Sequence, residues 1–153
     1  MPRPHVLIVE ARFYQELADQ LFSGVAAVLD AAAVTYERQW VFGSFELPAA
    51  IRFAIDGQRE GDLSRRFDGF IALGCVIEGE TDHYEHICRE ASRGLMDLSY
   101  QFAVPLGFGL LTCRSYEQAL ARAAVDRKNK GADAAHACLR MIELKGSLSQ
   151  ERA

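Results

Sequence analysis

The residues best suited to chemistry lie in one octapeptide, GETDHYEH, at positions 79–86. It crowds histidines and carboxylates between an apolar run, FIALGCVI, and a long segment with helical periodicity. A histidine titrates near neutral pH, so His83, in the first turn of the expected helix, can pass protons at physiological pH. Thr81 and Asp82 are good helix N-cap residues, and the free N–H groups at a helix start favour an anion, phosphate above all. The segment can therefore be a plain helix start capped by Asp82 and Glu85, a metal site, or a proton-transfer site beside an anion pocket.

The metal interpretation rests on His83 and His86, which are three residues apart and can share one face of a helix. Cys88 is a further candidate ligand, but it belongs to the apolar stripe of the same helix. No second cluster of ligand-type residues completes a coordination shell, so we expect no metal here. Taken alone, His86 is better explained as a surface residue.

The composition is that of one globular domain spanning residues 1–153, with 50% hydrophobic and 25% charged residues. The net charge of −4 and the dispersed basic residues predict no nucleic-acid partner. No apolar segment approaches the ~20 residues needed to cross a bilayer, and the N-terminus lacks a signal-peptide pattern, so we expect a cytoplasmic protein without a membrane partner. Four cysteines lie in apolar patterns without a C-x-x-C pair, which is typical of buried, reduced thiols. They are Cys75, Cys88, Cys113 and Cys138.

The octapeptide must be positioned by the apolar runs and helical stripes around it. The expected strands are 6–9, 35–42, 70–77 and 105–111. The expected helices are 14–33, 48–57, 84–102 and 132–144, with one more after residue 115. That additional helix follows from the capping-box pattern Ser115-x-x-Gln118. Gly107 and Gly109 allow another backbone to approach the last strand closely, and residues 57–68 have the composition of a polar loop.

Strands that alternate with helices predict an α/β domain with a parallel sheet and helices on both faces. Ligands of such sheets bind beyond the carboxyl ends of the strands, in the loops that lead into the helices. Here those loops contain EARFY, FGSFELP, GCVIEGETDH and TCRS. The octapeptide therefore lies on the edge of the sheet where function is expected.

Aromatic residues in or near these loops have two interpretations. Phe13, Phe45 and Phe108 would each, taken singly, be assigned to the core. In the functional interpretation, Phe13 and Phe45 wall a flat heterocycle while Glu46 accepts hydrogen bonds from hydroxyl groups. The simpler explanation of Glu46 is that it interacts with the dipole of the following helix.

Two cations near the ends of expected helices are equally ambiguous. Arg122 can be a surface charge or a phosphate clamp, and Lys130 allows the same two interpretations. The run Arg127 to Lys130 reads, by itself, as a solvated loop before a helix. Neither G-x-G-x-x-G nor a Walker loop is present, so the glycine-rich nucleotide fingerprints are absent.

Taken in order, several segments resemble the lumazine synthase family over nearly the whole chain, above all its alphaproteobacterial forms. They are ARFY, GSFELPAA, FDGFIALGCVIEGETDHYEHICREASRGL, VPLGFGLLT, EQALARA and KNKG. The resemblance implies a flavodoxin-like three-layer α/β sandwich with a parallel four-stranded sheet, assembled as a homopentamer. It implies a transferase of riboflavin biosynthesis that needs no metal or organic cofactor. The implied reaction condenses 5-amino-6-(D-ribitylamino)uracil with 3,4-dihydroxy-2-butanone 4-phosphate to 6,7-dimethyl-8-ribityllumazine, phosphate and water. Riboflavin synthase is a further implied partner.

The resemblance also implies roles for residues around the pyrimidine substrate. Phe13 matches the aromatic residue that stacks on the ring. A turn matches the segment that holds the ring and its ribityl chain, and a strand end matches the backbone that reads the pyrimidine edge. The turn is Ser44, Phe45 and Glu46, and the strand end is Cys75, Val76 and Ile77.

Around the phosphorylated substrate, the resemblance assigns the phosphate-binding turn to Glu80 and Thr81. Arg122 matches the phosphate-binding arginine, and His83 matches the proton-transfer histidine. Phe108 matches a pocket residue that reaches in from the adjacent subunit. Lys130, in the matching NKG segment, would contact the substrate or its neighbours.

Three residues depart from the family pattern. Cys75 stands where threonine is common, Glu78 where arginine is frequent, and Asp126 where lysine is common. The two acidic replacements predict lower substrate affinity. The short segment before the first strand favours a free pentamer or a pair of pentamers over an icosahedral shell. The alternatives are a non-catalytic flavin- or lumazine-binding protein, a structural shell protein and a metal hydrolase.

Overall fold

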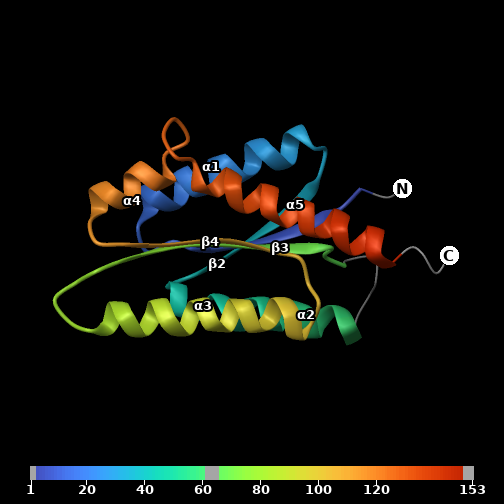
Figure 1. Cartoon of the computed structure of the whole chain (residues 1–153), viewed down its shortest axis with the longest axis horizontal. Coiled ribbons are helices and arrows are strands. Elements are labelled where there is room, and N and C mark those ends of the chain that lie inside the picture. Colours follow the sequence, from blue (N-terminus) through green and yellow to red (C-terminus); the bar gives the residue numbers. More distant parts are fainter. Residues whose placement is uncertain (1–2, 61–65, 150–153) are drawn as a thin grey trace.

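A computed structural model describes residues 3–60 and 66–149. Its parallel sheet has four strands in the order β2-β1-β3-β4, and helices cover both faces (Figure 1). The strands are β1 (His5–Ala11), β2 (Thr35–Val41), β3 (Gly69–Ile77) and β4 (Leu106–Cys113). The helices are α1 (Gln15–Ala31), the short 3-10 helix η1 (Ser44–Glu46), α2 (Leu47–Glu60), α3 (His83–Gln101), α4 (Tyr116–Ala123) and α5 (Lys130–Ser149). The predicted α/β three-layer sandwich is confirmed.

The sheet separates two hydrophobic clusters. Helices α1, α4 and α5 pack on one face, around Ile8 and Ile71, while α2 and α3 pack on the other, around Val9 and Phe70. Strand β3 is buried over Gly69–Val76, which explains why its sequence is a continuous apolar run rather than an alternating one. Among the described residues, no helix is both long and apolar enough to span a lipid bilayer.

Glycines allow α5 to lie directly against the sheet and α1. A Cβ atom at Gly107 would come within 2.1 Å of the Ala134 carbonyl oxygen, and one at Gly131 within 2.1 Å of the Leu21 carbonyl oxygen. A Cβ at Gly109 would lie 2.6 Å from the Leu73 side chain and 3.0 Å from the Ala72 carbonyl oxygen of β3. The predicted close backbone approach at Gly107 and Gly109 is therefore confirmed.

Several predicted boundaries were wrong. Helix α2 continues through Gly57 to Glu60, so the first part of the expected polar loop is helical, while residues 61–65 lie outside the described residues. An exposed glycine costs a helix only about 1 kcal/mol, too little to end it where its other face is packed. Helix α5 begins at Lys130 and runs to Ser149, and β4 continues past Leu111 to Cys113. Lys130 is thus helical rather than part of a solvated loop.

Candidate active site

The loops singled out in the sequence meet at the carboxyl edge of the sheet. Phe13 follows β1, η1 follows β2, and residues 78–82 connect β3 to His83, the first residue of α3. The parallel register places these strand ends side by side, with Ala11 opposite Val41 and Ile77 opposite Cys113. Helix α4 and the start of α3 lie at this same end of the molecule (Figure 1). We call this end the rim.

The floor of the rim is tightly packed. A Cβ atom at Gly74 would lie 2.7 Å from Ser44 Oγ and 3.2 Å from Ala11 Cβ. Ser44 is buried, so η1 rests on β3 immediately before Cys75, against the end of β1. The structure therefore brings together Ser44, the strand end 75–77 and the loop that carries Phe13. Glu46 is exposed, and its Oε1 accepts a hydrogen bond of 2.9 Å from the Gly43 N–H.

The three aromatic residues are not core residues, contrary to the interpretation of each taken singly. Phe13 is 74% exposed, Phe45 57% and Phe108 47%. Phe13 packs edge-on against Tyr14, with 4.9 Å between ring centroids, and Tyr14 in turn lies edge-on to Tyr116 at 6.3 Å. Exposed rings at a rim have a free face to offer a flat ligand.

Phe108 is not part of the rim of its own chain. It pairs with Ala72 in the register of β3 and β4, five residues before the Ile77–Cys113 pair. At the rise of a strand, that separation is roughly 15 Å. Its exposed ring lies on the edge strand, where another molecule can reach it.

The start of α3 differs from the expected capping arrangement. Thr81 Oγ1 accepts a hydrogen bond of 3.3 Å from the His83 N–H, whereas the Asp82 side chain makes no capping bond. Instead, an Asp82 carboxylate oxygen lies 3.3 Å from His86 Nε2. Asp82 therefore occupies the predicted N-cap position, but its carboxylate pairs with the histidine one turn later instead of capping the helix. Among the described residues, no hydrogen bond or ion pair reaches the exposed His83 ring.

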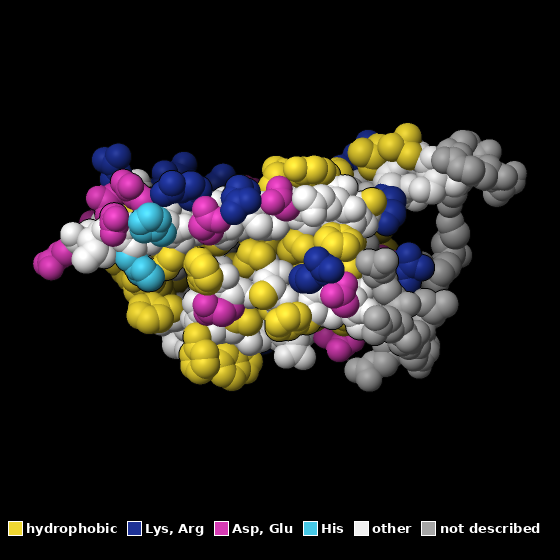
Figure 2. Space-filling model, turned by 90° about the horizontal axis from the view of Figure 1, so that it is seen from below, with side chains coloured by type: hydrophobic (Ala, Val, Ile, Leu, Met, Phe, Trp, Pro, Cys, Tyr) yellow, Lys and Arg dark blue, Asp and Glu magenta, His cyan; other side chains and the backbone are white. Residues whose placement is uncertain are grey.

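Histidine and acidic side chains gather at this end of the face formed by α2 and α3, beside exposed hydrophobic side chains (Figure 2). Glu78 and Glu80 are exposed in the loop after β3. Within residues 3–60 and 66–149, no group of three or more histidine, cysteine or acidic side chains is arranged to hold a metal ion.

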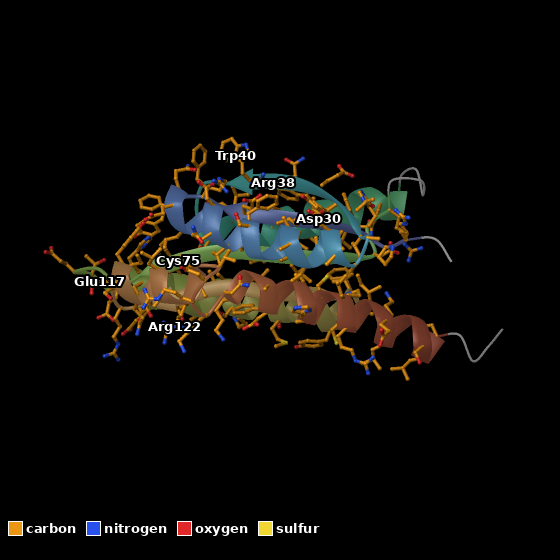
Figure 3. All side chains as sticks on the ribbon, turned by 90° about the horizontal axis from the view of Figure 1, so that it is seen from above. Asp30, Arg38, Trp40, Cys75, Glu117 and Arg122 are labelled. Carbon is orange, nitrogen blue, oxygen red and sulfur yellow. The ribbon has the colours of Figure 1, made fainter. Side chains whose placement is uncertain are left out.

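Arg122 reaches the same end of the molecule from α4. The predicted capping box is present, since Ser115 Oγ accepts from the Gln118 N–H at 3.1 Å and Gln118 Oε1 accepts from the Arg114 N–H at 2.7 Å. Arg122 donates from Nη1 to the Gln118 carbonyl oxygen at 3.4 Å and is partly buried. Figure 3 shows Arg122 and Cys75 at one end of the molecule. The Arg122 charge acts on Cys113, the last residue of β4, which lies opposite Ile77 at the end of β3.

The thiols near the rim are held in their neutral form. Burial raises the pKa of Cys75 to about 12, and the neighbouring Cys113 adds to the shift. Burial also raises the pKa of Cys113, although the Arg122 charge acts in the opposite direction. No disulfide joins the four cysteines, as predicted for reduced thiols. Neutral, buried thiols are poor nucleophiles, so the strand end offers its backbone rather than its sulfur.

Lys130 is exposed at the first turn of α5, with its Nζ 3.2 Å from an Asp133 carboxylate oxygen. The loop before it stands on the face of α1, α4 and α5 (Figure 1). Among the described contacts of Lys130, none joins it to the rim. A role for Lys130 in binding stays a prediction.

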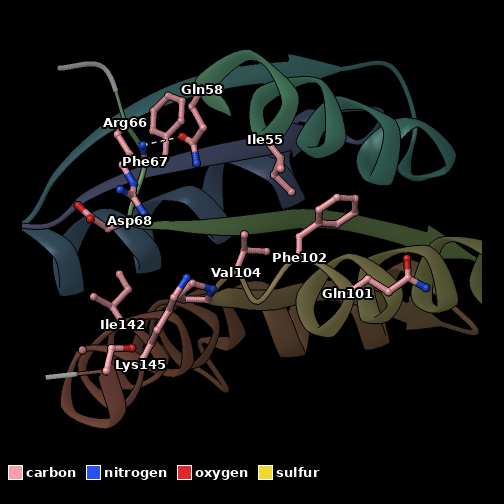
Figure 4. Close-up of a pocket in the computed structure, with 13 residues that line it drawn as sticks. Ile55, Gln58, Arg66, Phe67, Asp68, Gln101, Phe102, Val104, Ile142 and Lys145 are labelled. Atoms are coloured by element: carbon pink, nitrogen blue, oxygen red, sulfur yellow. Dashed lines mark hydrogen bonds between the residues drawn. The ribbon is translucent and has the colours of Figure 1, made fainter. Parts of the chain in front are cut away.

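A pocket of about 760 Å³ lies away from the rim, at the amino edge of the sheet (Figure 4). Phe67 and Phe102 form part of its wall, and Gln58 Oε1 accepts a hydrogen bond of 2.8 Å from the Phe67 N–H. None of the site residues predicted from the sequence lines it. In a single chain, the candidate site is an open rim rather than this cavity.

Sequence reasoning missed two groups beside the rim. One is Glu10, a buried carboxylate on β1, which binds the guanidinium groups of Arg12 and Arg38. The other is the pair Tyr14 and Tyr116, whose rings continue the aromatic contact that begins at Phe13. A charge inside the run VLIVEA was the available signal for Glu10, since it breaks an otherwise apolar buried strand.

Comparison with known proteins agrees over nearly the whole chain. The sequence model of the 6,7-dimethyl-8-ribityllumazine synthase family matches residues 3–146. A protein of that name from Paramagnetospirillum magneticum is 48% identical over 94% of this chain and 95% of its own length. 6,7-Dimethyl-8-ribityllumazine synthase 1 of Rhizobium meliloti is 49% identical, covering 97% and 95%. The synthase of Agrobacterium fabrum is also 49% identical, covering 97% and 99%.

Proposed function

This chain belongs to the 6,7-dimethyl-8-ribityllumazine synthase family, and we propose that the rim is where it makes 6,7-dimethyl-8-ribityllumazine. The reaction condenses 5-amino-6-(D-ribitylamino)uracil with 3,4-dihydroxy-2-butanone 4-phosphate. One observation carries the assignment to the rim: the aromatic loop after β1, the buried turn after β2 and the histidine-bearing start of α3 all lie at one edge of the sheet. That edge is where parallel α/β sheets bind ligands.

The pyrimidine substrate would lie over the floor made by Ser44 and the end of β3. Phe13 and Phe45 present exposed rings that can stack on a flat heterocycle. The backbone at 75–77 would donate to and accept from the ring edge. Glu46 uses Oε1 to bind the Gly43 N–H, which leaves its other oxygen for the ribityl hydroxyls. These contacts would hold the arylamine in one orientation.

The phosphorylated ketone would place its phosphate at the start of α3. The loop residues Glu80 and Thr81 form the turn, and the N-terminus of this long helix favours a dianion. Arg122, supported by α4, would supply a charge-assisted hydrogen bond to the phosphate oxygens. These groups would bind the phosphate group of the substrate and continue to bind the phosphate ion once it has been eliminated.

His83 is the group we assign to proton transfer. The arylamine adds to the ketone and loses water to give an imine, phosphate is then eliminated, and ring closure releases a second water. Each step moves a proton among carbon, nitrogen and oxygen, and an imidazole between the two substrates can give and take these protons in turn. Holding both substrates in the reactive orientation supplies a large further share of the rate.

Assembly as a homopentamer would complete the site. Exposed apolar side chains occur on β2 and on the following segment, at Trp40 and Phe42, and a different set lies on the opposite flank, at Met96 and Tyr100 of α3 and Phe108 of β4. Two unlike apolar surfaces on opposite flanks favour head-to-tail contacts, which close into rings. Such a contact could bring Phe108 of one copy to the rim of the next.

Three further properties are also proposals. They are a free pentamer or a pair of pentamers, a cytoplasmic location, and riboflavin synthase as a partner.

An assay with both substrates tests the proposed function. Purified protein should form fluorescent lumazine and release phosphate in equal amounts, and omission of either substrate should stop both signals. Light scattering on the same sample should give the mass of a pentamer or of a pair of pentamers. A protein that binds lumazine but forms none from the two substrates would instead be a non-catalytic binding protein.

A further inference from the structure

A buried carboxylate lies beneath the rim without any part in the chemistry described above. Glu10 is the penultimate residue of β1 and only 2% exposed. It lies on the sheet face that packs against α1, as do Ile8 and Val6, which are two and four residues earlier. A charge in such a place needs strong partners, because leaving water costs several kcal/mol.

Two arginines satisfy both oxygens of Glu10. Arg38 of β2 binds it in a fork, with Nε 2.7 Å from Oε2 and Nη2 3.0 Å from Oε1. Arg12, just beyond the end of β1, donates from Nη1 to Oε1 at 2.6 Å. The Arg38 guanidinium also lies over the Phe22 ring, 3.4 Å from its centroid. Figure 3 shows Arg38 and Trp40 on the same edge of the sheet.

Arg12 is held through both its main chain and its guanidinium group. Its N–H donates to the Val41 carbonyl oxygen at 3.3 Å, and its own carbonyl oxygen accepts from Gln15 Nε2 at 3.0 Å. Its guanidinium also binds the Gln15 side chain at 3.1 Å and pairs with Asp19. Phe13 is the next residue, and its exposed ring packs edge-on against Tyr14. The main chain at Arg12 therefore fixes the point from which the Phe13 side chain extends.

The same carboxylate links the two strands that lead to the aromatic loops. Through Arg12 it contacts the loop after β1, and through Arg38 it contacts β2, which leads to η1 and Phe45. Replacing a buried ion pair by apolar residues is often neutral or stabilising, so stability alone does not account for this arrangement. Fixing the relative position of two loops does account for it.

We propose that Glu10 is a positioning residue, which acts through Arg12 and Arg38 to set the spacing and tilt of the Phe13 and Phe45 rings for a flat heteroaromatic substrate. This inference rests on the proposed function, in which those rings hold the pyrimidine. It requires that loss of Glu10 weaken binding of the pyrimidine substrate without affecting the phosphorylated ketone.

Steady-state kinetics of Glu10→Gln, with each substrate varied in turn, test the inference. The KM for the ribitylaminouracil should rise about tenfold, as expected for the loss of one good stacking contact, while the KM for the phosphorylated ketone stays within about twofold. Glu37→Gln is the matched control, because Glu37 is a partly exposed carboxylate on β2 that pairs with His5 and touches neither arginine. It should leave both constants within about twofold. Equal changes in both constants for Glu10→Gln would overturn the inference.

A double-mutant cycle separates positioning from general loosening of the fold. If Glu10 acts through Phe13, Glu10→Gln should add less than about twofold to the effect of Phe13→Ala. Full additivity would overturn the inference. Should Glu10→Gln fail to fold, Arg38→Lys keeps the charge but loses the fork on Glu10, and it must show the same selective rise in the KM for the pyrimidine substrate. If Phe13→Ala raises the KM for the pyrimidine substrate and Glu10→Gln does not, this inference alone is refuted. If Phe13→Ala leaves that KM unchanged, the stacking role in the proposed function is refuted.

Discussion

Among single residues, His83 and His86 show how neighbours in one helical turn receive different environments. His86 pairs with Asp82, whereas the His83 ring is exposed at the rim and has no hydrogen bond or ion pair within residues 3–60 and 66–149. Its backbone N–H, by contrast, binds Thr81 Oγ1. An imidazole anchored through its main chain, with both ring nitrogens available, can exchange protons with a bound substrate.

Replacing His83 by alanine should lower turnover by about a hundredfold, the usual contribution of one acid–base group. Activity should not vanish, because binding and orientation of the two substrates do not need the ring. His86→Ala is the matched control and should stay within about twofold of the wild type, since it removes only an exposed ion pair. Initial rates of lumazine formation across a range of pH provide the measurement. Wild-type turnover in His83→Ala, with its pH dependence unchanged, would contradict the assignment.

Arg122 permits a test of the phosphate end of the site. Arg122→Ala should raise the KM for the phosphorylated ketone about tenfold or more, because a charge-assisted hydrogen bond contributes about 1.5–3 kcal/mol. The KM for the pyrimidine substrate should change little. Arg140→Ala removes the same charge from an exposed pair with Glu143 on α5, so it controls for net charge. Equal effects of Arg122→Ala on both substrates would reject the phosphate role.

Among the elements, α5 makes unusually close backbone contacts with its neighbours. Gly131 lies against the backbone of α1, and Gly107 of β4 lies against the backbone of α5. Asn129 enters the helix with φ of 50°, a left-handed conformation that asparagine tolerates better than most residues. The NKG segment therefore has a structural role at this helix start, whatever Lys130 does in binding.

Two alanine substitutions in α5 should change stability in opposite directions. Gly131→Ala should lower the free energy of unfolding by about 1–3 kcal/mol, because a Cβ there meets the Leu21 carbonyl oxygen and α1 must move. Gly146→Ala should raise it by about 0.5–1 kcal/mol, because a Cβ there meets nothing within 4 Å and alanine favours the helix. Urea unfolding followed by circular dichroism measures both. A loss of stability in the two variants alike would argue against specific packing at Gly131.

At the scale of the whole molecule, head-to-tail assembly would explain both the open rim and the two apolar flanks. Phe13 and Phe45 are exposed at the rim, and Phe108 is exposed on the β4 edge, far from its own rim. In a head-to-tail ring, each rim would be closed by the neighbour, and large aromatic side chains would leave water. A single chain would then hold only part of each active site.

Mixing two variants tests whether the site is shared between copies. If the chain assembles as the proposed pentamer, His83→Ala and Phe108→Ala proteins, each weakly active alone, should regain activity when they are unfolded and reassembled together. Random mixing in equal amounts would leave both His83 and Phe108 intact at about a quarter of the contacts between adjacent subunits. The gain should therefore approach that fraction of wild-type activity, measured as lumazine formation on mixed pentamers identified by native mass spectrometry. Mixed pentamers without any gain would argue against a shared site.

Much of the fold could be predicted because it depends on local patterns. The continuous apolar run of β3 and the Ser115 capping box each specify one element from a few neighbouring residues. The extension of α2 through Gly57 could not be predicted in this way. There, packing of the rest of the helix overrides a weak local signal.

By itself, the sequence determined the fold class, the edge of the sheet where the candidate loops meet and, through its motifs, the family. Those properties follow from periodicity and from residue types at fixed spacing, which tertiary contacts hardly alter. Only the tertiary structure decided that Phe13, Phe45 and Phe108 are exposed, that Asp82 turns to His86, and that Glu10 is buried between two arginines. Exposure and pairing depend on which distant residues arrive beside a side chain, and no local pattern encodes that arrangement.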